Sequence, residues 1–363
     1  MSGTYSEKHG FLNPHRGTEP RVALAIDWEG EIRHSIEATD WTWRSFPPFA
    51  GSPKLADALP LQVYEFRDAT SWDAATPNDR VVEALESGSI VFMPELSFAL
   101  EGDEQELLDP SIANTSSSKN VSFDPEDGSV GGAQGEGADR DRLARLLERY
   151  HSRSRTLLER LFPAYGPHLV AGRSSFRPLA IGGGEVKSWR ADDRRLHVDA
   201  FPRRPAQGRR ILRVFSNVNR SGEPRLWVIG GPFTEAANRF LPLAARIPTT
   251  AMRRLPWPAW ALQGLGLTKG RRTEYDRLML GLHDEMKADD AYQQGGVRRT
   301  FSFPAGSSWI VFTDMVPHAA IAGQHALEQT FYLPVEAMHH PERSPLRILE
   351  TLTHRTLAEP ART

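Results

Sequence analysis

The sequence predicts an α+β protein whose strands form one sheet system around a helical insertion. Short, partly alternating apolar runs, broken by Gly, Pro or Asn, occupy residues 170–230 and return at 298–337. Between them, residues 233–295 have a largely helical pattern with one proline- and tryptophan-rich interruption. Because strands stand on both sides of this insertion, we expect the second group to complete sheets that the first begins. The chain is therefore predicted to be a single domain, 1–363.

The composition narrows the class of protein. Hydrophobic residues make up 39% and charged residues 25% of the 363 positions, which is typical of a globular domain. The absence of cysteine excludes disulfides, thiolate metal ligands and a cysteine nucleophile. No apolar run reaches the roughly 18 residues of a membrane span, and the start, "MSGTYSEKHGFLNPHRG", lacks the apolar core of a signal peptide. We expect a cytoplasmic protein.

The first hundred residues, 1–100, are predicted to be an N-terminal flanking α/β part. Residues 1–60 are rich in Pro, Trp and charge and show little periodicity. The stretch "PNDRVVEALESG" (77–88) predicts a short helix, and "SIVFMPEL" (89–96) predicts a short buried strand.

Residues 101–141 are predicted to be an acidic flexible loop. They contain eleven acids against two basic residues, together with "NTSSSKN" and "GSVGGAQGEG". The alternative is an acidic arm that binds a partner.

The clearest helix follows, in "ADRDRLARLLERYHSRSRTLLERLF" (138–162). Its leucines recur at helical spacing, and Pro163 ends the pattern. The charges between the leucines are interpreted as a solvated face. A short helix is also expected near the end of the chain.

The stretch "RLHVDAF" holds the first candidate metal ligands. In a strand, residues i and i+2 point from the same face, so His197 and Asp199 can reach one point while Val198 packs behind them. One imidazole and one carboxylate are two thirds of the set that holds non-heme Fe(II), with a second histidine as the third ligand. His318, in "VPHAAIAG", offers that ligand, since apolar neighbours would direct it inward.

A structural interpretation of the same residues stays open. His197 and Asp199 could form a simple hydrogen-bonded or ion pair, and His318 could be a satisfied core histidine. His325 is a poorer ligand candidate, because it lies in an expected turn.

The segments "SSFRPLAIGG", "SWRADDRRLHVDAFPRRPAQGRRILRVFSNVN" and "VPHAAIAGQHALEQTFYLP" resemble the Kdo hydroxylases. These are Fe(II)- and 2-oxoglutarate-dependent dioxygenases that act on the 3-deoxy-D-manno-oct-2-ulosonic acid (Kdo) sugars of lipopolysaccharide. The resemblance is densest over 172–230 and 300–335, extends to "SKNVSFDPEDG" (118–128), and covers roughly two thirds of the chain.

This resemblance implies a fold, a set of ligands and a reaction. The fold would be a double-stranded β-helix (jelly-roll) core over 170–335, with the insertion 233–295 and flanking helices. His197, Asp199 and His318 would hold Fe(II). The reaction would replace C–H by C–OH at position 3 of Kdo, giving D-glycero-D-talo-oct-2-ulosonic acid, while 2-oxoglutarate, consumed with O₂, becomes succinate and CO₂.

A 2-oxoglutarate cosubstrate requires a buried cation for its far carboxylate, and a guanidinium suits that role. Many oxygenases with this triad place an Arg shortly after the distal His, but "LEQTFYLP" contains none. We expect Arg213 to replace it, because an Arg in an otherwise apolar strand is costly unless it is paired. The alternative is an Arg213 that faces solvent. Arg177 is a second candidate for either carboxylate, and Asn217 and Gln329 could add neutral hydrogen bonds.

A local basic cluster is expected to bind the substrate. Nine basic residues stand against four acids between residues 185 and 213. Arg177, Arg190, Arg203 and Arg204 are candidates for the carboxylates and phosphates of a Kdo-containing lipid A precursor, with Arg194, Arg195, Arg209 and Arg210 as further exposed members. A solvated basic loop is the alternative. Nucleic acid is not expected, since no binding motif or stacking platform is present.

The segment 252–272 interleaves Trp and Leu with Arg and Lys at both ends, which is typical of membrane interfaces. One interpretation is peripheral contact here with the cytoplasmic face of the inner membrane; the favoured interpretation is a loop packed on the protein's own core. Other functions stay open, namely the same chemistry on another anionic sugar acid, or a non-catalytic β-barrel module that binds anionic glycolipid. The sequence does not indicate an oligomeric state.

Overall fold

The computed structural model describes residues 62–113, 120–134, 137–182, 188–246 and 272–359, all within one compact unit, Asp57–Thr363. The predicted α+β class is confirmed. The strands are β1 (Val63–Glu65), β2 (Ile90–Met93), β3 (Val121–Phe123), β4 (Val130–Gly131), β5 (Val170–Arg177), β6 (Arg210–Asn217), β7 (Arg225–Gly230), β8 (Arg298–Phe303), β9 (Ser308–Phe312), β10 (His318–Ala322) and β11 (Ala326–Leu333). The helices are α1 (Asp79–Glu86), α2 (Ala138–Leu161), α3 (Phe233–Ala244), α5 (Glu274–Ala288), α6 (Asp290–Gln294) and α7 (Pro345–Thr353).

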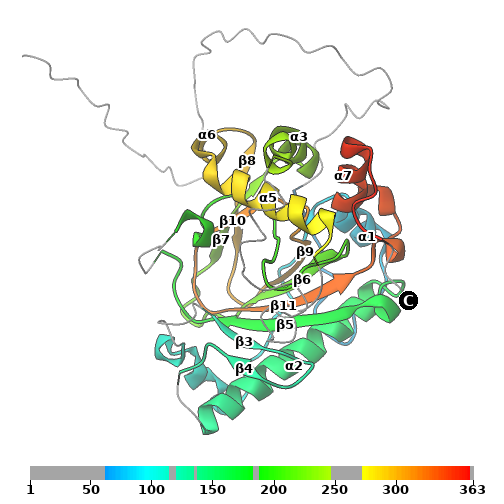
Figure 1. Ribbon diagram of the computed structural model, residues 1–363. Coiled ribbons are helices and arrows are strands. Elements are labelled where there is room, and N and C mark those ends of the chain that lie inside the picture. The colour runs from blue at the N-terminus through cyan, green and yellow to red at the C-terminus, as the bar shows by residue number, and fades with distance from the viewer. Residues whose placement is uncertain (1–61, 114–119, 135–136, 183–187, 247–271, 360–363) are drawn as a thin grey trace, which may run out of the picture. The chain divides into compact units, whose positions relative to one another are not determined.

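The strands form a large and a small sheet (Figure 1). The large sheet has the order β1-β2-β9-β6-β11-β5-β3-β4 and is antiparallel except for the β1–β2 pair. The small antiparallel sheet has the order β10-β7-β8. The large sheet therefore extends beyond the residues of the predicted core, 170–335. Strand β2, whose four apolar residues are all buried, pairs with β9 and extends the sheet into the N-terminal part.

Aromatic side chains fill the space between the two sheets. Phe215 of β6 and Trp309 of β9 come from the large sheet, and Trp227 of β7 and Phe303 of β8 from the small one. The ring centroids of Phe215 and Trp227 are 5.1 Å apart, and those of Trp227 and Trp309 are 5.6 Å apart. This inner face of β6 also carries Arg213, two residues before Phe215.

Helix α2 covers the other face of the large sheet and runs along β5 and β3 (Figure 1). The hydroxyl of its Tyr150 lies 3.2 Å from both the carbonyl of Val214 and the hydroxyl of Ser216. All eight residues of β6 are buried, because both of its faces are covered. This explains why alternation alone could not decide which face of β6 is the interior.

The acidic stretch 101–141 is not a flexible loop where the structure describes it. It contains two short 3₁₀ helices, Gly102–Leu108 and Pro110–Ile112, strands β3 and β4, and the start of α2. Two features explain why the prediction of a flexible loop was wrong. Spaced apolar residues such as Leu107 and Phe123 are buried, and the acids pair with arginines of α2, as in the 3.0 Å contact between Arg142 and Asp103.

Helices α3, α5 and α6 form the described part of the insertion 233–295. Helix α5 packs closely on α3 at Gly281, where a Cβ atom would lie 2.7 Å from that of Ala244. The expected membrane contact lies outside the described residues, apart from Arg272 at its end. Among the described helices, none combines the length and the hydropathy that crossing a bilayer requires.

Candidate active site

Backbone pairing between two distant segments brings the three candidate ligands together. His197 and Asp199 lie outside both sheets: the strand expected around them is reduced to a single β-bridge between His197 and His318, the first residue of β10. The amide of His197 donates to the carbonyl of His318 at 3.0 Å, and the amide of His318 donates back at 2.8 Å. A third backbone hydrogen bond, from the amide of Asp199 to the carbonyl of Thr313 at 2.8 Å, holds the backbone of Asp199 in place.

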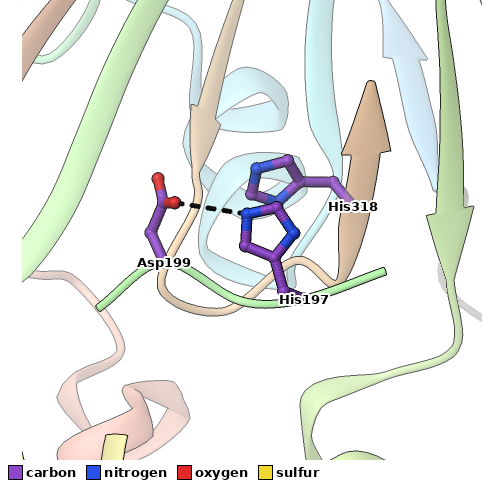
Figure 2. A group of neighbouring side chains, drawn as sticks. All are labelled: His197, Asp199 and His318. Carbon is purple, nitrogen blue, oxygen red and sulfur yellow. Dashed lines mark ion pairs between the residues drawn. The ribbon is translucent and has the colours of Figure 1, made fainter. Parts of the chain in front are cut away.

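The ligand atoms of these residues converge. One nitrogen or oxygen from each lies within 4.8 Å of the others, and all three side chains are buried. Figure 2 shows the two imidazole rings side by side and the Asp199 carboxylate turned toward His197, with 3.8 Å between Oδ1 and Nε2. This arrangement matches the two-histidine, one-carboxylate set of non-heme iron sites.

Hydrogen bonds orient both imidazole rings for metal binding. Nδ1 of His197 lies 2.7 Å from the carbonyl of Arg195, and Nδ1 of His318 lies 2.8 Å from the carbonyl of Val316. Because a carbonyl oxygen only accepts, each Nδ1 carries a hydrogen, and each Nε2 keeps its lone pair for a metal.

The electrostatics keep these ligands in the protonation states that bind cations. Burial lowers the pKa of His197 well below its ordinary value of 6.5, with a smaller contribution from nearby His318. The pKa of His318 is also lowered by burial. Burial alone would raise the pKa of Asp199, but the charge of the adjacent Arg213 guanidinium lowers it below its ordinary 3.8. The set at neutral pH is two neutral imidazoles and one carboxylate.

Arg213 faces the interior, as expected, and supports the triad directly. Nη1 donates to Oδ2 of Asp199 at 2.5 Å, and Nη2 donates to Glu328 of the neighbouring strand β11. Nε and Nη2 of Arg177, on β5, donate to the carboxylate of Glu328 at 2.9 and 2.7 Å. Glu328, in the stretch where many oxygenases with this triad place an Arg, thus holds one arginine from each of the two strands that flank β11.

Arg225 is a guanidinium that the sequence argument missed. It is 2% exposed and lines the same cavity, and its Nε and Nη1 have no hydrogen-bond partner among the described residues. The indole nitrogen of Trp227, two residues later on the same face of β7, is likewise buried without a described partner. Burial lowers the pKa of Arg225 to about 9, so the group is charged at neutral pH. The signal was present in "EPRLWVIGG", an Arg at the start of an apolar strand.

Close backbone packing fixes the position of Arg225. A Cβ atom on Gly323, whose φ is +109°, would lie 2.8 Å from the Cα of Arg225. Only glycine allows this approach and tolerates this backbone conformation. Arg225 is thereby held against the turn that follows β10.

The triad and these arginines line one cavity of about 490 Å³, which is within the range of small-molecule sites. Arg177 and Arg190 line it as expected, and Arg190 pairs with Asp284 at 2.9 Å. Sequence reasoning missed the residues that α5 contributes to it, His283, Asp284 and Lys287. Their signal was the spacing of His and Lys four residues apart on one helix face.

Four predicted residues do not line the cavity. The side chain of Asn217 donates to the carbonyls of Glu223 and Phe303 at 3.0 Å. Gln329 lies on the opposite face of β11, where its amide donates to the carbonyl of Gly172 at 3.2 Å. Arg204 pairs with Asp124 at 2.7 Å, and Arg203 is exposed.

Arg210, expected to be exposed, is fully buried. It pairs with Asp314 at 2.8 and 3.1 Å and stacks on Phe312, 3.8 Å from the ring centroid. The prediction of an exposed Arg210 was wrong because both faces of β6 are covered by other elements. An Arg is tolerated in such an interior when it is paired.

A two-histidine, one-carboxylate set beside a cation-lined cavity between two sheets defines a non-heme Fe(II) oxygenase. A sequence model of the 3-deoxy-D-manno-oct-2-ulosonic acid (Kdo) hydroxylase family matches residues 68–356. The chain therefore belongs to the Kdo hydroxylase family.

Solved structures of a relative agree with this assignment. The Kdo hydroxylase KdoO, a non-heme Fe(II) α-ketoglutarate dependent dioxygenase, in complex with cobalt(II) is 44% identical to the chain, with a TM-score of 0.75. The alignment covers 83% of this chain and 99% of that one. The complexes of KdoO with α-ketoglutarate and Fe(III), and with succinate and Fe(III), match with the same identity and coverage and a TM-score of 0.74. Among curated proteins, none matches the chain.

Proposed function

We propose that the chain is an Fe(II)- and 2-oxoglutarate-dependent dioxygenase that hydroxylates the Kdo sugar of a Kdo-containing lipid A precursor at position 3. The product would be D-glycero-D-talo-oct-2-ulosonic acid, with succinate and CO₂ as coproducts. The observation that carries the proposal is the buried His197, Asp199 and His318 set in a cavity lined by cations. The similarity to KdoO supports the substrate class.

The donor set fits Fe(II) in number, type and protonation state. Bound there, the metal would supply O₂ activation for C–H hydroxylation, with 2-oxoglutarate as the cosubstrate. The chain's own residues do three things: the carbonyls of Arg195 and Val316 orient the imidazoles, Arg213 keeps Asp199 ionised, and the surrounding apolar rings limit water.

The cavity also fits an anionic cosubstrate. We propose that Arg225 and the indole nitrogen of Trp227 bind the far carboxylate of 2-oxoglutarate, with Arg213 and Arg177 close by. The unpartnered, buried donor atoms of Arg225 support this, because such a group is costly without an anion. Arg213, the cation expected from the sequence, would contribute to carboxylate binding only in second place, because it already pairs with Asp199 and Glu328.

Two finer points belong to the proposal. The packing of the two sheets around an aromatic core supports a double-stranded β-helix, in which these sheets would be the two halves of the jelly-roll. A cytoplasmic location with peripheral contact at the inner membrane through 252–272 stays a prediction.

The test begins with anaerobic addition of Fe(II) and 2-oxoglutarate to the purified protein, followed by visible absorption of the metal–keto acid chelate. Wild type and an exposed control, Arg220→Met, should show the charge-transfer band. His197→Ala should lose it, and Arg225→Met should require far more 2-oxoglutarate. Iron binding without a band would exclude 2-oxoglutarate as the cosubstrate, and no iron binding would exclude the class.

The substrate is tested separately with Kdo-containing lipid A precursor. We expect a mass increase of one oxygen atom on the Kdo unit, together with succinate in equal amount. Succinate formation that this lipid does not stimulate, while another sugar acid does, would move the assignment to that substrate.

A further inference from the structure

Helix α5 presents a buried ammonium group to the cavity. Lys287 is 2% exposed and lines the cavity. Its Nζ donates to the backbone carbonyl of Arg190 at 2.9 Å. No described carboxylate forms a direct ion pair with it, and its charge is favoured from a greater distance by Asp193, Asp199, Asp192 and Asp284. An ammonium has three donors, so two remain for a ligand. Burying such a charge is costly unless an anion or further hydrogen bonds compensate.

The position of Lys287 relative to the triad follows from its helix. His283 lies one turn earlier on the same face of α5, and its ring packs edge-on against that of His197, with 5.2 Å between centroids. This face of α5 therefore lies beside the metal-ligand set.

The cavity has two separate sources of positive charge. Arg177, Arg213 and Arg225 belong to strands of the two sheets, whereas Lys287 belongs to the helical insertion. Arg190, next to Lys287, is paired with Asp284. A cosubstrate carboxylate on the strand arginines would leave Lys287 as a cation for a second anion.

We propose that Lys287 binds the carboxylate of the sugar acid and thereby positions the sugar over the metal ligands. This inference rests on the proposed function. In an oct-2-ulosonic acid the carboxylate is attached to C2, the neighbour of C3. A cation beside the triad that holds this carboxylate places C3 within the reacting region and selects for acidic sugars.

A purely structural role makes a different prediction. Lys287 ties α5 to the segment before the triad, but other contacts do so without its side chain. Arg195 donates to the backbone carbonyl of Lys287 at 2.5 Å, and the side chain of Gln293 binds both the amide and the carbonyl of Leu196 at 2.7 and 2.9 Å. Lys287→Met should therefore fold, and Arg239→Met removes another basic tie of the insertion, the 2.6 Å pair of Arg239 with Asp289, without changing the cavity lining. The other five lysines lie outside the described residues, so an arginine is the matched control.

The experiment is a binding cycle on the full chain loaded with Co(II) and 2-oxoglutarate. Calorimetry compares a Kdo glycoside with the same glycoside carrying a neutral amide in place of the carboxylate. Wild type and Arg239→Met should prefer the acid by about 10- to 100-fold, the value expected for a charge-assisted contact. Lys287→Met should lose this preference while its affinity for the amide stays unchanged.

Kinetics supply a second readout. Lys287→Met should raise KM for the Kdo lipid and leave KM for 2-oxoglutarate unchanged. A full acid preference in Lys287→Met, or an equal loss in Arg239→Met, overturns the inference. If the wild type hydroxylates Kdo lipid but does not prefer the acid over the amide, only the inference about Lys287 is overturned. If the wild type shows no chelate band, the proposed function itself is overturned.

Discussion

At Arg225, the stability of the folded protein and the binding of a ligand make opposite demands. Its guanidinium is buried, and two of its three nitrogens have no partner within the described part of the chain. A buried charge without a partner lowers the stability of the folded state, and nothing in the packing of β7 requires an Arg at this position. Retention of such a group is expected where a ligand compensates it.

We expect Arg225→Met to raise the free energy of unfolding of the metal-free protein by about 1–4 kcal/mol at neutral pH, because it removes an uncompensated charge. The same variant should lose most of the stabilisation that 2-oxoglutarate gives the wild type in the presence of Co(II). Urea unfolding with and without both ligands measures the two effects. A destabilised variant that still responds fully to 2-oxoglutarate would contradict this role.

The lowered pKa values of His197 and His318 predict the pH dependence of metal binding. Because burial keeps both imidazoles neutral below their ordinary 6.5, proton competition should begin only at lower pH. Cobalt(II) affinity, followed by absorption, should stay constant from neutral pH down past 6.5. A midpoint at or above 6.5 would contradict the lowered pKa values.

The lowered pKa values of His197 and His318 also make the stability of the metal-free protein depend on pH. The unfolded chain binds protons at these histidines near pH 6.5, whereas the folded chain does not. The free energy of unfolding should therefore fall as the pH drops below 6.5.

At the scale of elements, Glu328 joins three neighbouring strands of the large sheet. From β11 it holds Arg213 of β6 on one side and Arg177 of β5 on the other. Arg213 in turn holds Asp199, so the carboxylate of β11 contributes to the geometry of the metal site without touching a metal. Glu328 lies in the stretch where many oxygenases with this triad place an Arg and where this sequence has none.

Glu328→Gln should lower the free energy of unfolding by about 3–5 kcal/mol, because it leaves the buried Arg213 and the half-buried Arg177 without their shared counter-charge. The matched control is Glu336→Gln, which breaks an exposed pair with Arg347 at 3.3 Å and should cost less than about 1 kcal/mol. Denaturant titration of both variants measures the difference. Equal effects would show that the buried bridge contributes little.

At the scale of the whole molecule, the metal site connects parts of the chain that are far apart in sequence. The ligands come from an extended segment after residue 195 and from the start of β10, while α5 from the insertion adjoins one of them. Binding of a cation should therefore stabilise the packing of these elements together.

Cobalt(II) at about 100 times its Kd should raise the free energy of unfolding by about 2.7 kcal/mol. The increase should disappear in His318→Ala and persist in His339→Ala, an exposed histidine after the last strand. Thermal unfolding with and without a chelator measures the effect. Persistence of the increase in His318→Ala would place the cation elsewhere.

Several features of the site could be predicted from the sequence, because they follow local rules. The H-x-D spacing indicated that His197 and Asp199 act together, and apolar neighbours direct His318 inward. The expected strand at 197–199 is only a bridge to His318, which tertiary contacts hold. The helix at 138–162 followed from its leucine spacing. The acidic stretch 101–141 was misassigned, because its order comes from arginines of α2 and from scattered buried residues, neither of which a local composition reveals.

The sequence by itself determined the α+β class, the ligand set and the presence of arginines for an anionic substrate. Only the tertiary structure decided what each arginine does. Arg213 and Arg177 find their carboxylate 115 and 151 residues away, and Arg225 finds none among the described residues. The physical reason is that the cost of a buried charge depends on contacts between distant segments, and the period of a strand whose two faces are both covered does not encode those contacts.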